Sequence, residues 1–197
     1  MSGSARTLTL ADIALPRTGL LHDALLATAA SLLTAMAARI VVPLPWTPVP
    51  LTGQTFAVLL SGAVLGVRRG FLAQSIYLTE GTLGLPVFAG GAAGWATFAG
   101  PTGGYLAAFP FAAALTGMLA ERGWDRRFPS MLGAMLAGSS VIFAGGLLGL
   151  SRFVPAPGLL AAGLLPFIPG DLVKAALAAL VFPTLWRRVD RRGRIDA

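Results

Sequence analysis

Residues 131–150 read MLGAMLAGSSVIFAGGLLGL, a segment in which no side chain carries a charge. An α-helix of about 20 residues crosses the hydrocarbon core of a bilayer, because each residue adds about 1.5 Å. Longer uncharged runs extend from Ile40 to Val67, from Gly81 to Ala120 and from Phe128 to Ser151. Segments of this kind predict an all-α integral membrane protein.

The composition supports this class. Of the 197 residues, 55% are hydrophobic and 12% are charged, whereas a soluble domain has roughly 25% charged residues. The mean hydropathy is +0.76. We therefore predict a single membrane domain over residues 22–188, preceded by a cytoplasmic N-terminal arm (residues 1–21) and followed by a basic cytoplasmic tail (residues 189–197).

Several functions are excluded by the residues that the sequence lacks. There is no cysteine, and a lone histidine, His22, cannot build an imidazole metal site. The single lysine, Lys174, follows Val173 and not the glycine that precedes the lysine of a nucleotide-binding P-loop, so we do not expect this chain to hydrolyse ATP. The net charge of +7 comes from arginines beside apolar segments and not from a basic stripe, so nucleic acid is not expected as a partner. We expect no metal, no cofactor and no catalytic activity.

Prolines, glycines and charges divide the chain into six predicted transmembrane spans. Their approximate limits are 23–42, 52–67, 70–79, 105–120, 131–150 and 171–186, the last bent near Pro183. With the N-terminus inside, twelve of the fifteen basic residues fall on the cytoplasmic side. This asymmetry is the positive-inside pattern, and it places both termini in the cytoplasm. The location that we expect is the inner membrane of a bacterium.

The connections on the outer side are rich in proline and glycine. Between Glu80 and Gly104 there are eight glycines and two prolines and almost no charge. A loop with so few polar side chains is more stable when it is buried than when it is exposed to water. We therefore predict non-helical backbone that folds over the outer face of the helix bundle and is buried in protein.

Asp171 and Lys174 stand out because they lie three residues apart in the apolar segment Pro166–Lys174. Ionisable groups at such a depth usually face a cavity, a partner charge or a ligand. At helical spacing both side chains lie on one face and can meet one polar object. An alternative is that Asp171 stabilises the helix N-terminus with Lys174 as its partner.

Four motifs, in this order, resemble those of the biotin-specific S components of energy-coupling factor (ECF) transporters, the BioY family. They are Pro48–Thr55, Tyr77-Leu78 with Glu80-Gly81 and Gly84–Phe88, then Gly100–Tyr105, and Pro166–Lys174. The resemblance covers about residues 20 to 188. It implies a six-helix subunit that captures biotin on the outer side and works with a coupling membrane subunit and two ATPases. Other members of the family function alone or as oligomers, so self-association is the alternative that the resemblance leaves open.

Biotin offers two ureido N–H donors and a carbonyl acceptor around an apolar bicycle. Asp171 can accept from an N–H and Lys174 can donate to the carbonyl, each bond contributing roughly 1.5–3 kcal/mol. Gln54 and Thr52 can bond the ring or the tail carboxylate, for which Arg39 and backbone N–H groups are further candidates. The predicted apolar wall consists of Tyr77, Phe88, Trp95 and Tyr105.

Other interpretations stay open at this point. Small residues recur every four positions at Ala27, Ser31 and Ala35, a face that suits either packing within the chain or docking of another subunit. The same architecture could serve another vitamin, such as thiamine or riboflavin. A membrane enzyme or assembly factor would be expected to carry a catalytic His, Cys or metal cluster.

Overall fold

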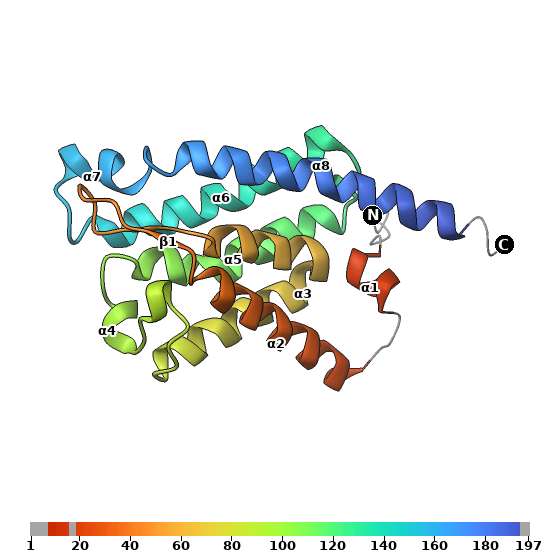
Figure 1. The fold of residues 1–197 in the computed structure, drawn as a ribbon, viewed down its shortest axis with the longest axis horizontal. Coiled ribbons are helices and arrows are strands. Elements are labelled where there is room, and N and C mark those ends of the chain that lie inside the picture. The colour runs from red at the N-terminus through yellow and green to blue at the C-terminus, as the bar shows by residue number, and fades with distance from the viewer. Residues whose placement is uncertain (1–7, 16–18, 194–197) are drawn as a thin grey trace, which may run out of the picture.

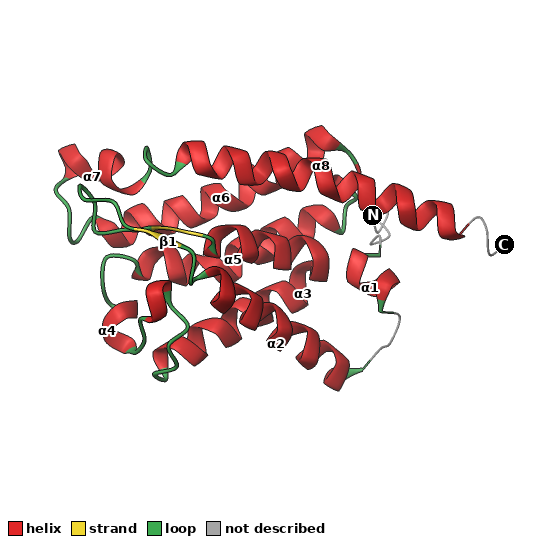
Figure 2. Ribbon diagram, viewed as in Figure 1, coloured by secondary structure: helices red, strands yellow, loops and turns green. Residues whose placement is uncertain are grey.

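The computed structural model describes residues 8–15 and 19–193, and over these residues it is almost wholly helical (Figures 1 and 2). The elements are α1 (Leu10–Ala14), α2 (Leu20–Ala37), β1 (Val41–Val42), β2 (Leu51–Thr52), α3 (Gln54–Thr82), η1 (Ala89–Gly91), α4 (Trp95–Phe98), α5 (Gly103–Ala120), η2 (Trp124–Arg126), α6 (Phe128–Leu150), α7 (Ala156–Gly163) and α8 (Ile168–Gly193).

Of the described residues, five helical stretches are long and apolar enough to cross a membrane. They are α2, α3, α5, α6 and the stretch Ala156–Val189, which contains α7 and most of α8. The predicted all-helical membrane class is therefore supported by the length and composition of the helices.

The long helix α3 consists of two halves that fold back on each other at Gly66, where the backbone is non-helical with φ 82° and ψ −175°. Only glycine adopts such a φ readily. Gln74 Nε2 donates a 2.9 Å hydrogen bond to Ser61 Oγ although the two residues are 13 apart in sequence. In a straight helix they would be separated by about 20 Å. The break lies close to the predicted boundary between the second and third spans.

Glycines allow the backbones in the centre of the bundle to approach closely. A Cβ at Gly104 on α5 would lie 2.8 Å from the Cα of Gly149 on α6. A Cβ at Gly62 would clash with the carbonyl oxygen of Ala113, so the first half of α3 also packs tightly on α5. Close contact between small residues is a main source of helix association in a membrane, where lipid is as apolar as the side chains.

The two ends of the bundle differ (Figure 1). The hairpin that carries β1 and β2 lies at the same end as α4 and α7, whereas α1 and the last turns of α8 lie at the other. The strands pair antiparallel, with Val41 opposite Thr52.

Several predicted boundaries are wrong. The first span ends at Ala37 rather than at residue 42, because the chain then enters β1. The segment 80–104 is not wholly irregular, since it contains the end of α3 together with η1 and α4. The last helix begins at Ile168 and not at Asp171, because a proline is tolerated in a first helical turn. That helix also continues through the limit predicted for the tail.

Candidate functional site: a cavity between the hairpin and helices α5, α6 and α8

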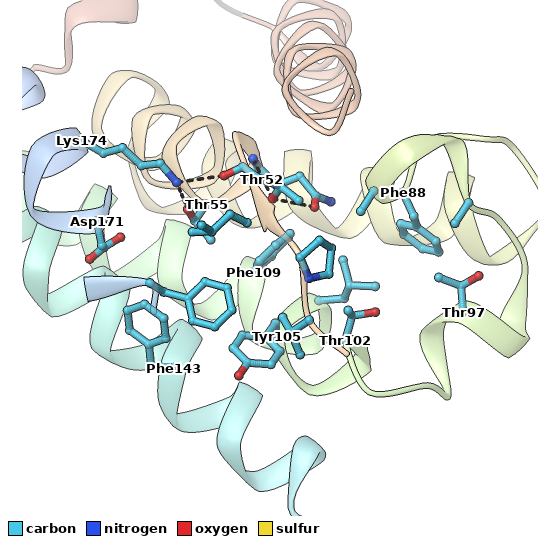
Figure 3. Close-up of a pocket in the computed structure, with 18 residues that line it drawn as sticks. Thr52, Thr55, Phe88, Thr97, Thr102, Tyr105, Phe109, Phe143, Asp171 and Lys174 are labelled. Carbon is cyan, nitrogen blue, oxygen red and sulfur yellow. Dashed lines mark hydrogen bonds between the residues drawn. The ribbon is translucent and has the colours of Figure 1, made fainter. Parts of the chain in front are cut away.

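A cavity of about 240 Å³ lies where the hairpin meets the starts of α3 and α8 (Figure 3). Most of its wall is apolar or aromatic, formed by Val49, Pro50, Leu51, Phe88, Ala89, Ala92, Tyr105, Leu106, Phe109, Phe143 and Phe167. The polar lining residues are Thr52, Gln54, Thr55, Thr97, Thr102, Asp171 and Lys174. An apolar wall with a few placed polar groups is typical of a site for a small organic solute.

Lys174 is held in place by two acceptors at the start of α3. Its Nζ donates to the carbonyl oxygen of Thr52 at 2.8 Å and to Thr55 Oγ1 at 3.0 Å. An ammonium group has three donors. The arrangement therefore leaves Lys174 one further donor for a solute in the cavity.

Asp171 lines the same cavity from the first turn of α8 and is 8% exposed. Among the described side chains, no ion pair within 4.0 Å joins it to Lys174. Figure 3 shows why, since the lysine extends toward Thr52 and Thr55 while the carboxylate occupies another part of the wall. A buried carboxylate is costly unless it is hydrogen-bonded. The Ser139 hydroxyl of α6 is a neighbouring donor, and because the carboxylate also lines the cavity it can accept from N–H groups of a solute.

Gln54 belongs to a chain of hydrogen bonds that fixes the polar side of the cavity. Thr52 Oγ1 donates to Gln54 Oε1 at 3.0 Å, and Gln54 Nε2 donates to the Tyr77 hydroxyl at 2.5 Å. That hydroxyl in turn donates to the carbonyl oxygen of Val87 at 2.9 Å. The chain links the hairpin, both halves of α3 and the loop after it, so it orients the amide before a solute arrives.

The aromatic wall is supported from behind. Tyr77 is fully buried, stacks on Phe109 with ring centroids 6.3 Å apart, and meets Phe88 edge-on at 5.7 Å. The Tyr105 ring faces the cavity and its hydroxyl donates to the carbonyl oxygen of Gly163 at 2.7 Å. This bond ties α5 to the end of α7.

Of the predicted binding residues, six line the cavity, namely Asp171, Lys174, Gln54, Thr52, Phe88 and Tyr105. The structure does not bring the other three to its wall. Tyr77 lies one layer behind. Trp95 is 66% exposed and rests on Phe98, and Arg39 is exposed, with its Nη2 donating to the carbonyl oxygen of Pro86 at 2.7 Å.

Several lining residues were not among the predicted binding residues. Thr55 lies within the motif Pro48–Thr55, and its hydroxyl could have been recognised as part of that cluster. Phe109 and Phe143 lie in the middle of uncharged helices, where nothing in the sequence distinguishes a cavity wall from ordinary core. The hydroxyls of Thr97 and Thr102 come from the glycine-rich segment, whose path the sequence did not reveal.

The small-residue face proposed for packing or docking lies mostly inside the chain. Ala27 and Ser31 are fully buried, and Ala35 is partly buried against the core. The Ser31 hydroxyl donates to Glu80 on α3 at 2.5 Å. In this structure the face packs against α3, and α2 presents large apolar side chains such as Leu25, Leu32 and Met36 on its exposed surface.

A bundle of long apolar helices with a small, amphipathic cavity at one end defines a membrane-embedded protein that binds a small solute. The comparison with known sequences and structures is more specific. The chain belongs to the BioY family, whose profile matches residues 7–191.

Two similar proteins are the probable biotin transporter BioY of Pyrococcus horikoshii and the biotin transporter BioY of Rhizobium etli. The first is 45% identical over 76% of this chain and 86% of that protein. The second is 40% identical over 76% of this chain and 88% of that protein. The crystal structure of the S-component for biotin from an ECF-type ABC transporter superposes with a TM-score of 0.73 and 26% identity, covering 85% of this chain and 92% of that one.

Proposed function

We propose that this protein is the biotin-capture subunit of an ECF-type transporter. The observation that carries the proposal is the pairing, in one apolar cavity, of a buried carboxylate with an ammonium group that has a donor to spare. The ureido head of biotin has the complementary groups, two N–H donors and one carbonyl. Asp171 accepts from an N–H and Lys174 donates to the carbonyl, while the aromatic wall covers the bicycle.

We assign the valerate tail to the other end of the cavity. In Figure 3 Thr97 and Thr102 lie well away from Asp171, and both line the cavity. Thr102 is the N-cap residue of α5, where backbone N–H groups have no partner within the helix. Hydroxyls beside a helix start suit a carboxylate. In this assignment Arg39, which donates to Pro86, does not hold the tail.

For the membrane arrangement we propose six crossing segments, with the two halves of α3 counted separately and both termini in the cytoplasm of a bacterium. The break at Gly66 supports the count. The orientation is supported by the clustering of arginines away from the cavity end, so that the cavity opens outward. The proposed partners are a coupling membrane subunit and two ATPases, or a second copy of this chain.

The relatives are named as transporters of biotin, which favours this substrate over thiamine or riboflavin and favours transport over enzymatic activity. The test is direct binding to purified protein in detergent. We expect tight, stoichiometric association with biotin and no competition from thiamine or riboflavin. Absence of saturable biotin binding by folded protein would refute the proposal. Uptake of labelled biotin by cells that express the chain with and without a coupling module would then identify the energy source.

A further inference from the structure

A second pocket lies at the end of the bundle remote from the solute cavity. Its volume is about 340 Å³, and it is formed by η2, the start of α6 and one face of α8. Asp171 belongs to the first cavity and Arg187 to the second. At about 1.5 Å per residue along α8, these two positions are about 24 Å apart. The two pockets have no lining residue in common. They can therefore be perturbed separately.

Three guanidinium groups surround this second pocket. Arg126 and Arg127 come from the loop before α6, and Arg187 comes from α8. Within the described side chains, no ion pair involves any of them. One acid of the loop, Asp125, is buried, accepts a 2.6 Å hydrogen bond from Trp186 Nε1 and offsets part of the charge of Arg126, so in the described part of the chain the three guanidinium groups face a single carboxylate. The pocket thus has a strong excess of positive charge.

The arginines are partly preorganised. The Arg126 guanidinium lies 4.3 Å from the centroid of the Trp186 ring, and Arg187 Nη2 donates to Thr184 Oγ1 at 3.1 Å. Arg127 is the N-cap residue of α6, a helix of 23 residues whose start carries no side-chain cap. Pro129 in the first turn has no N–H, but the other N–H groups of that turn and the helix dipole add to the attraction for an anion.

The rest of the pocket is apolar, and some of its apolar side chains are exposed on the outside of the bundle. Ala179 and Pro183 are buried in its wall, while Leu180 and Phe128 are 60% and 42% exposed. A free anion would gain nothing from these side chains, whereas the acyl chains of a lipid would cover them. Basic pockets between transmembrane helices bind the head groups of anionic lipids.

We propose that this pocket binds the phosphate group of an anionic phospholipid. Arg126, Arg127 and Arg187 contact the phosphate oxygens, and Leu180 and Phe128 contact the first part of the acyl chains. Arginine suits this role because its planar fork can donate two hydrogen bonds to one phosphate. The inference goes beyond the proposed transport function and does not depend on which solute fills the other cavity.

The test is native mass spectrometry of the purified full chain in detergent micelles, titrated with dioleoyl phosphatidylglycerol or dioleoyl phosphatidylcholine. We expect the anionic lipid to bind at least about 10-fold tighter than the zwitterionic one. The double variant R127Q/R187Q should lose at least about 10-fold of the phosphatidylglycerol affinity, while leaving Arg126 stacked on Trp186. Equal affinity for the two lipids would overturn the proposal.

The matched control is R68Q/R122Q, which removes two exposed arginines that do not line the pocket. Its affinity for phosphatidylglycerol should fall by less than about threefold, since only long-range attraction is lost. An equal loss in both double variants would show an effect of net charge alone and would overturn the site. Inorganic phosphate is titrated separately, and saturation of the pocket by phosphate without a lipid adduct would overturn the assignment to a lipid.

If R127Q/R187Q does not fold, as judged by circular dichroism and melting temperature, R127K/R187K replaces it. This variant keeps both charges but loses the planar forks, so phosphatidylglycerol should bind about threefold or more weakly. Unchanged affinity in the lysine variant would overturn the proposed contacts.

Discussion

Replacing Lys174 with methionine tests the central contact of the proposed biotin site. Methionine has a similar length and no charge, so the apolar shape of the cavity is kept while the ammonium group is removed. In the structure that group lies 2.8 Å from the Thr52 carbonyl oxygen and 3.0 Å from Thr55 Oγ1. The substitution therefore removes one proposed bond to the solute together with two bonds inside the protein.

The expected loss of biotin affinity follows from the bond to the solute. A hydrogen bond with one charged partner contributes about 1.5–3 kcal/mol, and each 1.4 kcal/mol corresponds to about a tenfold change in Kd. Lys174→Met should therefore weaken biotin binding by roughly 10- to 150-fold. The two internal bonds affect mainly the stability of the free protein.

The assay is isothermal titration calorimetry of purified protein in detergent, with Thr55→Val as the companion variant. Valine keeps the shape of threonine and removes one of the two acceptors that hold the ammonium group. This loss of a positioning bond should weaken biotin binding by less than about 10-fold. If Thr55 acts through the lysine, Thr55→Val should have no further effect once Lys174 is methionine.

Two results would refute this reasoning. Wild-type affinity in a folded Lys174→Met protein would mean that the ammonium group does not contact biotin. Full additivity of the two substitutions would mean that Thr55 acts independently of Lys174, contrary to the hydrogen bond between them.

Three further predictions concern other parts of the molecule. Gly104→Ala should lower the free energy of unfolding by about 1–3 kcal/mol in thermal unfolding, because the added Cβ would clash with α6. The control Gly158→Ala should be nearly neutral, since its Cβ would lie 3.7 Å from Val154. Equal effects of the two substitutions would contradict the close packing of α5 on α6. Trp186→Phe should destabilise the protein by about 2–3 kcal/mol in chemical denaturation, because it leaves the buried Asp125 carboxylate without its indole donor. Adding Asp125→Asn to this variant should recover part of the lost stability. No recovery would argue against the lost hydrogen bond as the cause. The third prediction concerns Asp12 on α1. Burial by itself would raise the pKa of this carboxyl, but hydrogen bonds from Thr9 and the charge and hydrogen bond of Arg69 outweigh burial and lower the pKa below 3.8. The contribution of Asp12 to the docking of α1 should therefore be complete above about pH 5 and be lost as the pH falls through 3.8 to the folded-state pKa. Hydrogen exchange of residues 10–14 would detect this change, and Asp12→Asn should abolish it.

Some features of the site could be recognised from the sequence because they are chemically rare in it. An acid and the single lysine three residues apart in an apolar segment point to a cavity, and both line one in the structure. Thr52 and Gln54 were predicted differently, as polar groups near the outer end of the second span that could bond the ligand implied by the resemblance, and both also line the cavity. Whether Trp95 and Tyr77 line the cavity could not be predicted from the sequence. An aromatic residue in an apolar chain can equally face lipid, pack behind a cavity wall or line the cavity.

The helical membrane class can be predicted without the structure, because the backbone of a long uncharged run is satisfied in lipid only within a helix. The sequence also indicated the family and the acid–amine pair. Three features became visible in the folded molecule alone: Lys174 turns toward Thr52 and Thr55, Phe109 and Phe143 line the cavity, and three arginines from two segments share a pocket. Each of these features depends on contacts between residues far apart in the chain. Uncharged helices that pack through glycines carry no local signal of which face meets which neighbour.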